Sequence, residues 1–163
     1  MNTTSPGVAL VTGASSGIGL ATANALRNAG FRVFGTSRRA AAKKSDGFTM
    51  LACDVTDDKS VAKLVERVLA EAGRIDVLVN NAGMGLLGAA EESSTAQAQA
   101  LFDVNVFGVF RVTNAVLPTM RRQGNGRIVN LSSVQGFIPG PFFALYSSTK
   151  HAVEGYSESL DHE

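Results

Sequence analysis

Cysteine is nearly absent from this sequence, because Cys53 is the only one in 163 residues. A single cysteine cannot form an intramolecular disulfide, and this one lies in the apolar run MLAC (50–53), which is typical of a buried strand. We therefore expect a chain that works in a reducing compartment, most simply the cytoplasm.

An excess of charge of either sign is also lacking. Fifteen basic and fourteen acidic side chains leave a formal net charge of +1. The sequence thus has no electrostatic signature of a dedicated nucleic-acid-binding protein. The two histidines, His151 and His162, have no matching cluster of ligands, so we expect no metal site.

Long hydrophobic runs are missing too. No apolar run approaches the roughly 20 residues that cross a bilayer, and the N-terminus is short and polar. We expect neither membrane insertion nor secretion. Residues 1–6 are expected to form a flexible tail.

The sequence does contain enough apolar material for one domain. Hydrophobic residues make up 45% of the chain and charged residues 18%, which is a globular composition. A chain of this length can bury a sizeable core, and no linker or internal repeat divides it. We expect a single domain over residues 1–163.

Short apolar runs alternate with segments of helical periodicity. The runs predict buried strands at residues 8–12, 32–36, 48–53, 75–80 and 126–133. The segments after them predict helices at about 17–29, 57–72, 95–123 and from 145 onward. Asp57 has the character of an N-cap, and Gly30 and Gly73 that of helix stops. This alternation is typical of a doubly wound, Rossmann-like α/β domain with a parallel sheet, which binds ligands at the carboxyl ends of its strands.

A glycine-rich segment, TGASSGIG (12–19), follows the first predicted strand and opens the first predicted helix. Glycines at 13, 17 and 19 allow a tight turn and a close approach to a pyrophosphate, whose charge the helix N-terminus favours. The spacing is GxxxGxG, not GxGxxG, and the lysine of a P-loop is missing. We interpret the loop as a dinucleotide site, with a purely structural turn as the alternative.

The end of the second strand bears on the choice of dinucleotide. Folds that select NAD place an Asp or Glu there to bind the ribose 2'-hydroxyl. This sequence has Thr36-Ser37-Arg38-Arg39, with no carboxylate to repel a 2'-phosphate and a guanidinium suited to binding one. We predict a preference for NADP(H) over NAD(H). The alternative is that the arginines simply solvate a loop.

Tyr146 and Lys150 are four residues apart at the start of the last predicted helix. Helical spacing puts them on one face, close enough for the ammonium to act on the phenol. A Tyr and a Lys at this spacing also cover the surface of many ordinary helices. The pair alone does not decide the function.

Taken together, these features resemble the short-chain dehydrogenase/reductase family. The resemblance covers essentially the whole chain, and its motifs occur in the family's order. They are TGASSGIG, Asp54-Val55 after the third strand, NNAG at 80–83, Asn105, Ser133 and the Tyr146/Lys150 pair. Six weak motifs in sequence are far more specific than any one of them.

The resemblance implies a cofactor site along the strand ends. The pyrophosphate would contact the glycine loop, the 2'-phosphate would meet Arg38 beside Ser37, and Asp54 and Val55 would border the adenine. The implied cofactor-binding residues are Gly13, Ser15, Ser16, Gly17, Ile18, Gly19, Ser37, Arg38, Asp54, Val55, Asn80, Asn81, Ala82, Gly83, Tyr146 and Lys150, with Thr12 packed behind them.

The resemblance also implies four catalytic residues, Asn105, Ser133, Tyr146 and Lys150. Ser133 is preferred to Ser132 because the family's serine lies thirteen residues before its tyrosine. A hydride that moves onto a carbonyl leaves an alkoxide, so the site needs a proton donor at that oxygen. Tyr146 would be that acid or base, Lys150 would favour its phenolate, and Ser133 would hold the substrate oxygen. Asn105 would hold a water that links Lys150 to solvent, or would satisfy backbone groups.

The implied function is that of an NADP(H)-dependent carbonyl reductase or alcohol dehydrogenase acting on a small molecule. Apolar residues flank the implied catalytic residues, as expected for a lipophilic substrate or, alternatively, for a core. They are Met84, Leu86, Leu87, Phe137, Ile138, Pro139, Pro141, Phe142 and Phe143. The resemblance further implies a homodimer or tetramer, through pairing of the long helices.

The sequence departs from the family at its end. The chain stops at Glu163, within the helix that begins near Tyr146, whereas family members continue for two more strands. We expect the C-terminal part of the usual domain to be missing and the fifth strand to be an unpaired edge. The alternative function is a truncated chain that binds the dinucleotide or a partner chain without catalysis.

Overall fold

The centre of the molecule is a β-sheet, and five of its six described strands are parallel. The computed structural model describes residues 6–39, 44–45 and 47–163, so the predicted tail lies outside the described residues except for Pro6. The strands stand in the order β3-β4-β2-β1-β5-β6. Their bounds are Val8–Val11 for β1, Arg32–Ser37 for β2, Lys44–Ser45 for β3, Phe48–Ala52 for β4, Val77–Asn80 for β5 and Arg127–Asn130 for β6.

All five predicted strands are confirmed, and so is their parallel pairing. The structure adds β3, a two-residue strand antiparallel to β4 that the sequence did not predict. The strand order reverses at β1, which pairs with β2 on one side and with β5 on the other. In a doubly wound sheet, this reversal is the position at which ligands bind.

Helices α1 (Gly17–Asn28) and α2 (Asp58–Ala72) begin and end close to their predicted positions. Asp57 is confirmed as the N-cap of α2, because its side chain accepts a 2.9 Å hydrogen bond from the backbone N–H of Lys59. Gly73 ends α2 in a left-handed conformation, with φ of 72°.

The helix predicted over 95–123 is continuous but irregular. It consists of α3 (Thr95–Phe102), a π-helical turn η2 (Asp103–Phe107) and α4 (Gly108–Gln123). Turns of this kind are rare and are often found at functional sites. The remaining helix is α5 (Ala144–Asp161), and the short 3₁₀ turns η1 (Ala90–Glu92) and η3 (Val134–Gly136) lie in the loops.

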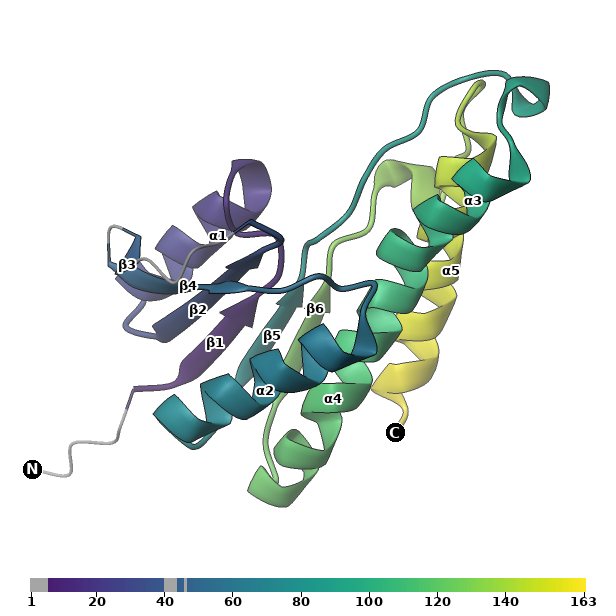
Figure 1. Ribbon diagram of the computed structural model, residues 1–163. Helices are drawn as coiled ribbons and strands as arrows, with labels where there is room; N and C mark the ends of the chain where they lie inside the picture. The colour runs from purple at the N-terminus through teal and green to yellow at the C-terminus, as the bar shows by residue number, and fades with distance from the viewer. Residues whose placement is uncertain (1–5, 40–43, 46) are drawn as a thin grey trace, which may run out of the picture.

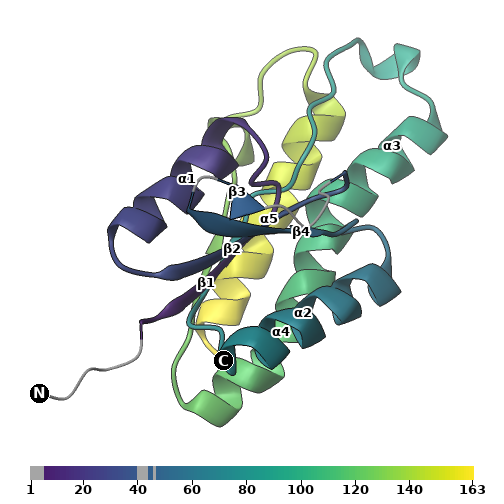
Figure 2. The ribbon, with the colours of Figure 1, turned by 60° about the vertical axis from the view of Figure 1, so that its left-hand side comes forward.

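Helices cover both faces of the sheet, as predicted (Figure 1, Figure 2). Helix α1 lies on one face, whereas α2, α4 and α5 lie on the other. Because side chains alternate along a strand, β1 contributes to two cores. Leu10 packs with residues of α2 and α4, and Ala9 packs with Ala23 of α1.

The helical stretch Thr95–Gln123 is long and apolar enough to cross a membrane, by length and composition only. By that measure, the expectation that no apolar run is long enough to cross a bilayer is wrong. In the structure this stretch behaves as a core helix, since Leu101, Val112 and Val116 are fully buried. Helix α4 packs against α2 and β5, so Val112 and Val116 face the protein interior.

Strand β6 lies at the edge of the sheet, as predicted for the fifth strand. In the described part of the chain it pairs only with β5. Val129 on this strand exposes 41% of its surface. An exposed apolar edge of this kind can pair with a further strand.

Asp76, in the turn before β5, ties together the starts of three strands. Its Oδ2 accepts a 2.7 Å hydrogen bond from the N–H of Val8, and its carbonyl accepts a 2.8 Å bond from the N–H of Arg127. Arg74 donates to both carboxylate oxygens. Burial opposes the charge of Asp76, but the hydrogen bonds from Arg74 and Val8 outweigh it and lower the pKa of the carboxyl.

Asp76→Ala is expected to destabilise the fold by about 1–3 kcal/mol, because the buried amide of Val8 loses its acceptor. Asp76→Asn keeps an acceptor oxygen there and should lose less. Since the folded pKa is lowered, the carboxylate stabilises the fold fully above the unfolded pKa of about 3.9, and this contribution is lost as the pH falls through the folded value. Urea denaturation of the three proteins at neutral and acid pH measures both effects. Equal midpoints for the Ala and Asn variants would contradict this role.

Candidate active site

The loop between β1 and α1 depends on glycine. Gly13 and Gly17 have φ of 67° and 54°, a conformation that other residues rarely adopt. A Cβ at Gly19 would collide with the carbonyl oxygen of Gly13 and with the side-chain amide of Asn81. The side chain of Ser16 does not cap α1, so the first N–H groups of this helix are open to an anion. A phosphate group fits this position.

Thr12 and Asn81 hold the glycine loop from behind. The Thr12 hydroxyl accepts 3.0 Å hydrogen bonds from the N–H groups of Asn81 and Ala82. The Asn81 amide donates to the carbonyls of Thr12 and Gly13, at 2.9 and 3.1 Å. These contacts join the ends of β1 and β5, a role for the Asn81 side chain that the sequence did not predict.

A cavity of about 850 Å³ runs along the carboxyl ends of β1, β2, β4 and β5. It brings together most of the predicted cofactor residues, which come from four separate loops. Its lining contains Gly13, Ser15, Ser16, Ile18, Gly19, Thr36, Ser37, Arg38, Arg39, Cys53, Asp54, Val55, Asn81, Ala82, Gly83, Met84 and Val104. Parallel strands place their carboxyl ends at one edge of the sheet, and this geometry creates the groove.

Some predicted cofactor residues do not line this groove. Gly17, Tyr146 and Lys150 lie outside its lining, and so does Asn80. Asn80 is buried, and its amide donates to Thr113 and Asn130 at 3.0 and 2.9 Å, so it supports the sheet from within. Among the described residues, no group of His, Cys, Asp and Glu is placed to hold a metal ion.

Two charged side chains flank the end of the groove beside β2 and β4. Asp54 accepts hydrogen bonds from the N–H and the hydroxyl of Thr56, at 3.0 and 2.8 Å. These bonds lower the pKa of its carboxyl, with the charge of Arg38 as a smaller cause. Arg38 is exposed and forms no ion pair within the described residues. Its guanidinium is thus available to an anionic ligand.

Lys150 joins α5 to the sheet. Its Nζ donates a 2.8 Å hydrogen bond to the carbonyl of Leu131, just after β6, and lies 5.6 Å from the centre of the Tyr146 ring. Both side chains therefore share one face of α5, as their spacing predicts. Burial lowers the pKa of the Lys150 ammonium, and the charge of Glu154 opposes this shift.

Asn105 lies in the π-helical turn and is only 2% exposed. Its Oδ1 accepts a 2.8 Å hydrogen bond from the N–H of Met84, and its Nδ2 donates to the Met84 carbonyl at 2.8 Å and to the Thr149 hydroxyl at 3.2 Å. These contacts satisfy backbone groups, which was the alternative that the sequence left open. They connect the loop after β5 to the helix that carries Lys150. A water between Asn105 and Lys150 stays a prediction.

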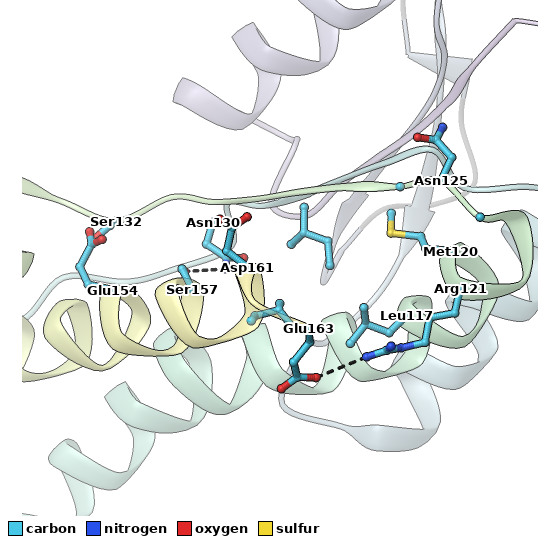
Figure 3. A pocket seen from close by; sticks show the side chains of 14 residues that line it. Leu117, Met120, Arg121, Asn125, Asn130, Ser132, Glu154, Ser157, Asp161 and Glu163 are labelled. Carbon is cyan, nitrogen blue, oxygen red and sulfur yellow. Dashed lines mark hydrogen bonds and ion pairs between the residues drawn. The ribbon is translucent and has the colours of Figure 1, made fainter.

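Ser132 and Ser133 follow β6 but have different surroundings. Ser133 precedes η3, and its hydroxyl accepts a 3.2 Å hydrogen bond from the N–H of Gln135. The Ser132 hydroxyl is buried without a hydrogen-bond partner among the described residues. It lies beside Glu154 in a second cavity of about 580 Å³ between α4, β6 and α5 (Figure 3), which contains none of the predicted cofactor residues.

The sequence profile of the short chain dehydrogenases matches residues 7–163 of this chain. The chain is 45% identical to a 3-ketodihydrosphingosine reductase of Bacteroides thetaiotaomicron, over 95% of its own length and 57% of the relative's. It is 42% identical to human 17-beta-hydroxysteroid dehydrogenase type 1, over 94% of its length and 51% of the relative's. The chain thus spans little more than half of these curated relatives.

Solved structures agree with the sequence matches. A short-chain dehydrogenase from Streptomyces avermitilis has a TM-score of 0.90 and 44% identity, over 97% of this chain and 60% of its own. ElxO with NADP bound has a TM-score of 0.87 and 31% identity, over 93% of this chain and 65% of its own. The doubly wound sheet, with a glycine-lined groove at its strand ends, is that of a dinucleotide-binding domain. The chain belongs to the short-chain dehydrogenase/reductase family.

The surroundings of the two serines lead to different expectations for their alanine variants. Because the family resemblance implies that Ser133 holds the substrate oxygen, Ser133→Ala is expected to lower kcat about 100-fold, the loss typical of removing one donor to a developing oxyanion. Ser132→Ala should leave kcat unchanged and keep or raise the melting temperature, because a buried hydroxyl without a partner costs about 1–3 kcal/mol. Steady-state rates and thermal melts check both. A larger loss of kcat in Ser132→Ala would reverse the choice of serine.

Proposed function

We propose that this chain is the cofactor-binding and catalytic part of an NADP(H)-dependent carbonyl reductase or alcohol dehydrogenase. Tyr146 is its general acid or base, and its substrate is a lipophilic ketone or secondary alcohol. The observation that carries the proposal is the Lys150–Tyr146 pair at the carboxyl end of the sheet, 5.6 Å from ammonium to ring. The nucleotide groove opens at the same end.

Arg38 supports a preference for NADP(H). It lines the groove just after β2, where a fold that selects NAD has a carboxylate, and Ser37 stands beside it. A guanidinium presents a planar set of donors that matches two oxygens of a phosphate. ElxO, a structural neighbour, was solved with NADP bound.

The proposed chemistry divides between cofactor and protein. The bound cofactor supplies or accepts the hydride. Tyr146 donates its phenolic proton to the substrate oxygen in reduction and takes it back in oxidation. The ammonium of Lys150 lies 5.6 Å from the centre of the Tyr146 ring, and the Ser133 hydroxyl holds the substrate oxygen.

Exposed apolar side chains on the loop that precedes α5, and on the loop that it contacts, support a lipophilic substrate. The loops after β5 and before α5 meet in a 3.0 Å hydrogen bond from the N–H of Gly88 to the carbonyl of Phe142. Exposed on these loops are Met84, Leu87, Phe137, Ile138 and Phe142. Because they are exposed, they are not core, and an apolar surface beside a site favours apolar ligands. Two relatives are named for a sphingoid ketone and a hydroxysteroid.

Tyr146→Phe tests the proposal, because it removes the proton donor and keeps the ring. Oxidation of NADPH is followed by absorbance with a panel of short-chain, long-chain and polycyclic ketones. Turnover is expected to fall about 10²–10⁴-fold, with little change in the Kd for NADPH. Tyr156→Phe, at the other tyrosine, is the matched control. NADPH binding without turnover by the unmodified protein would favour the alternative, a chain that binds the dinucleotide without catalysis.

Arg38→Ala tests the choice of cofactor. A hydrogen bond to a charged group contributes about 1.5–3 kcal/mol, so the Kd for NADPH is expected to rise roughly 10- to 100-fold while that for NADH stays nearly constant. Arg122→Ala, at the far end of α4, makes the same change in net charge and is the control. Fluorescence titrations with both nucleotides measure the effect. Tighter binding of NADH than NADPH by the unmodified protein would refute this preference.

A further inference from the structure

Gln135 is a side chain between β6 and α5 that the proposed chemistry does not use. It lies in η3, two residues after Ser133, and its Oε1 accepts two hydrogen bonds. One comes from the hydroxyl of Ser147 at 2.8 Å, and the other comes from the N–H of Gly140 at 2.7 Å. The backbone N–H of Gln135 donates to the Ser133 hydroxyl at 3.2 Å.

Ser147 connects this set of bonds to α5. It directly follows Tyr146, is only 3% exposed, and donates its N–H to the carbonyl of Phe143 at 2.7 Å. The side chain of Gln135 therefore contacts the first turn of α5, and its main chain contacts Ser133. One residue links the two segments whose side chains act on the substrate oxygen in the proposed mechanism.

The loop between η3 and α5 keeps its conformation through hydrogen bonds such as the one from Gly140 to Gln135. Phe142 has φ of 65°, a conformation that is strained for a residue with a side chain and persists only where its surroundings hold it. Phe137, Ile138 and Phe142 are each more than 60% exposed, so their side chains contribute little packing. The bond from Gly140 to Gln135 anchors the loop on the side of η3.

We propose that Gln135 is a positioning residue. It holds Ser133, the loop of residues 137–143 and the first turn of α5 as one unit, so that the Ser133 hydroxyl and the Tyr146 phenol keep a fixed separation. This inference rests on the proposed function, because the separation matters only if both groups act on one oxygen. A displacement of about 1 Å at reacting groups slows an enzyme roughly 100-fold.

Three substitutions separate positioning from simple packing. Gln135→Leu keeps the size of the side chain and removes the acceptor, whereas Gln135→Glu keeps an acceptor oxygen for both donors. Ser147→Ala removes one of the two donors. Val134→Ala changes a neighbouring residue that is 67% exposed and serves as the matched control.

In Gln135→Leu, kcat for ketone reduction is expected to fall about tenfold or more, and in Gln135→Glu it should return to within about threefold of the parent. The double variant Gln135→Leu/Ser147→Ala should be no slower than the slower single variant. Gln135→Leu already removes the hydrogen bond that Ser147→Ala breaks. The Kd for NADPH should stay constant in all of them, since Gln135 does not line the groove. Chymotrypsin, which cleaves after phenylalanine, should cut the 137–143 loop several-fold faster in Gln135→Leu.

The inference is overturned if Gln135→Leu changes kcat and loop cleavage no more than Val134→Ala does, or if Gln135→Glu restores neither. If Gln135→Leu does not fold, Ser147→Ala decides by the same two measurements. Absence of turnover from the unmodified protein overturns the proposed function and the catalytic part of the inference. Unchanged loop cleavage, with turnover present in the parent, overturns the inference alone.

Discussion

The close contact between the glycine loop after β1 and the NNAG segment after β5 is the constraint on which the site depends. Thr12 and Asn81 make the contact through backbone groups of the facing segment. It is possible only because Gly13 and Gly19 have no Cβ, since a Cβ at either position would press against Asn81. The contact joins the two strand ends where the order of the sheet reverses, and it leaves the first N–H groups of α1 open to the groove.

The other half of the site is held by contacts that α5 makes with three different segments. Lys150 reaches Leu131 after β6, Thr149 meets the π-helical turn, and Ser147 meets the turn after Ser133. These contacts hold the first turns of α5 although β6 is an edge strand. The buried ammonium of Lys150 destabilises the fold at neutral pH. Because burial lowers the pKa of Lys150, this cost is fully present below the folded pKa, and it disappears as the pH rises to the pKa of an ordinary lysine. Catalytic sites often retain groups of this kind.

Local patterns predicted most of the elements, because strands, caps and helix stops are made by residues close together in the sequence. The cap at Asp57 and the stop at Gly73 are examples. Strand β3 was not predictable, since its two residues form a strand only by pairing with β4. The π-helical turn at 103–107 was not predictable either, because the apolar pattern of a continuous helix does not mark one wider turn.

The sequence by itself determined the order of strands and helices, the glycine loop and the resemblance to a family, since each is a pattern of residue types at short spacing. Only the tertiary structure decided that Asn81 and not Asn80 lines the groove, and that Ser132 and Ser133 have different surroundings. It also decided that Gln135 contacts α5. The reason is physical: neighbouring residues at the end of a strand point to opposite sides, and only the packing of distant segments determines what each side contains.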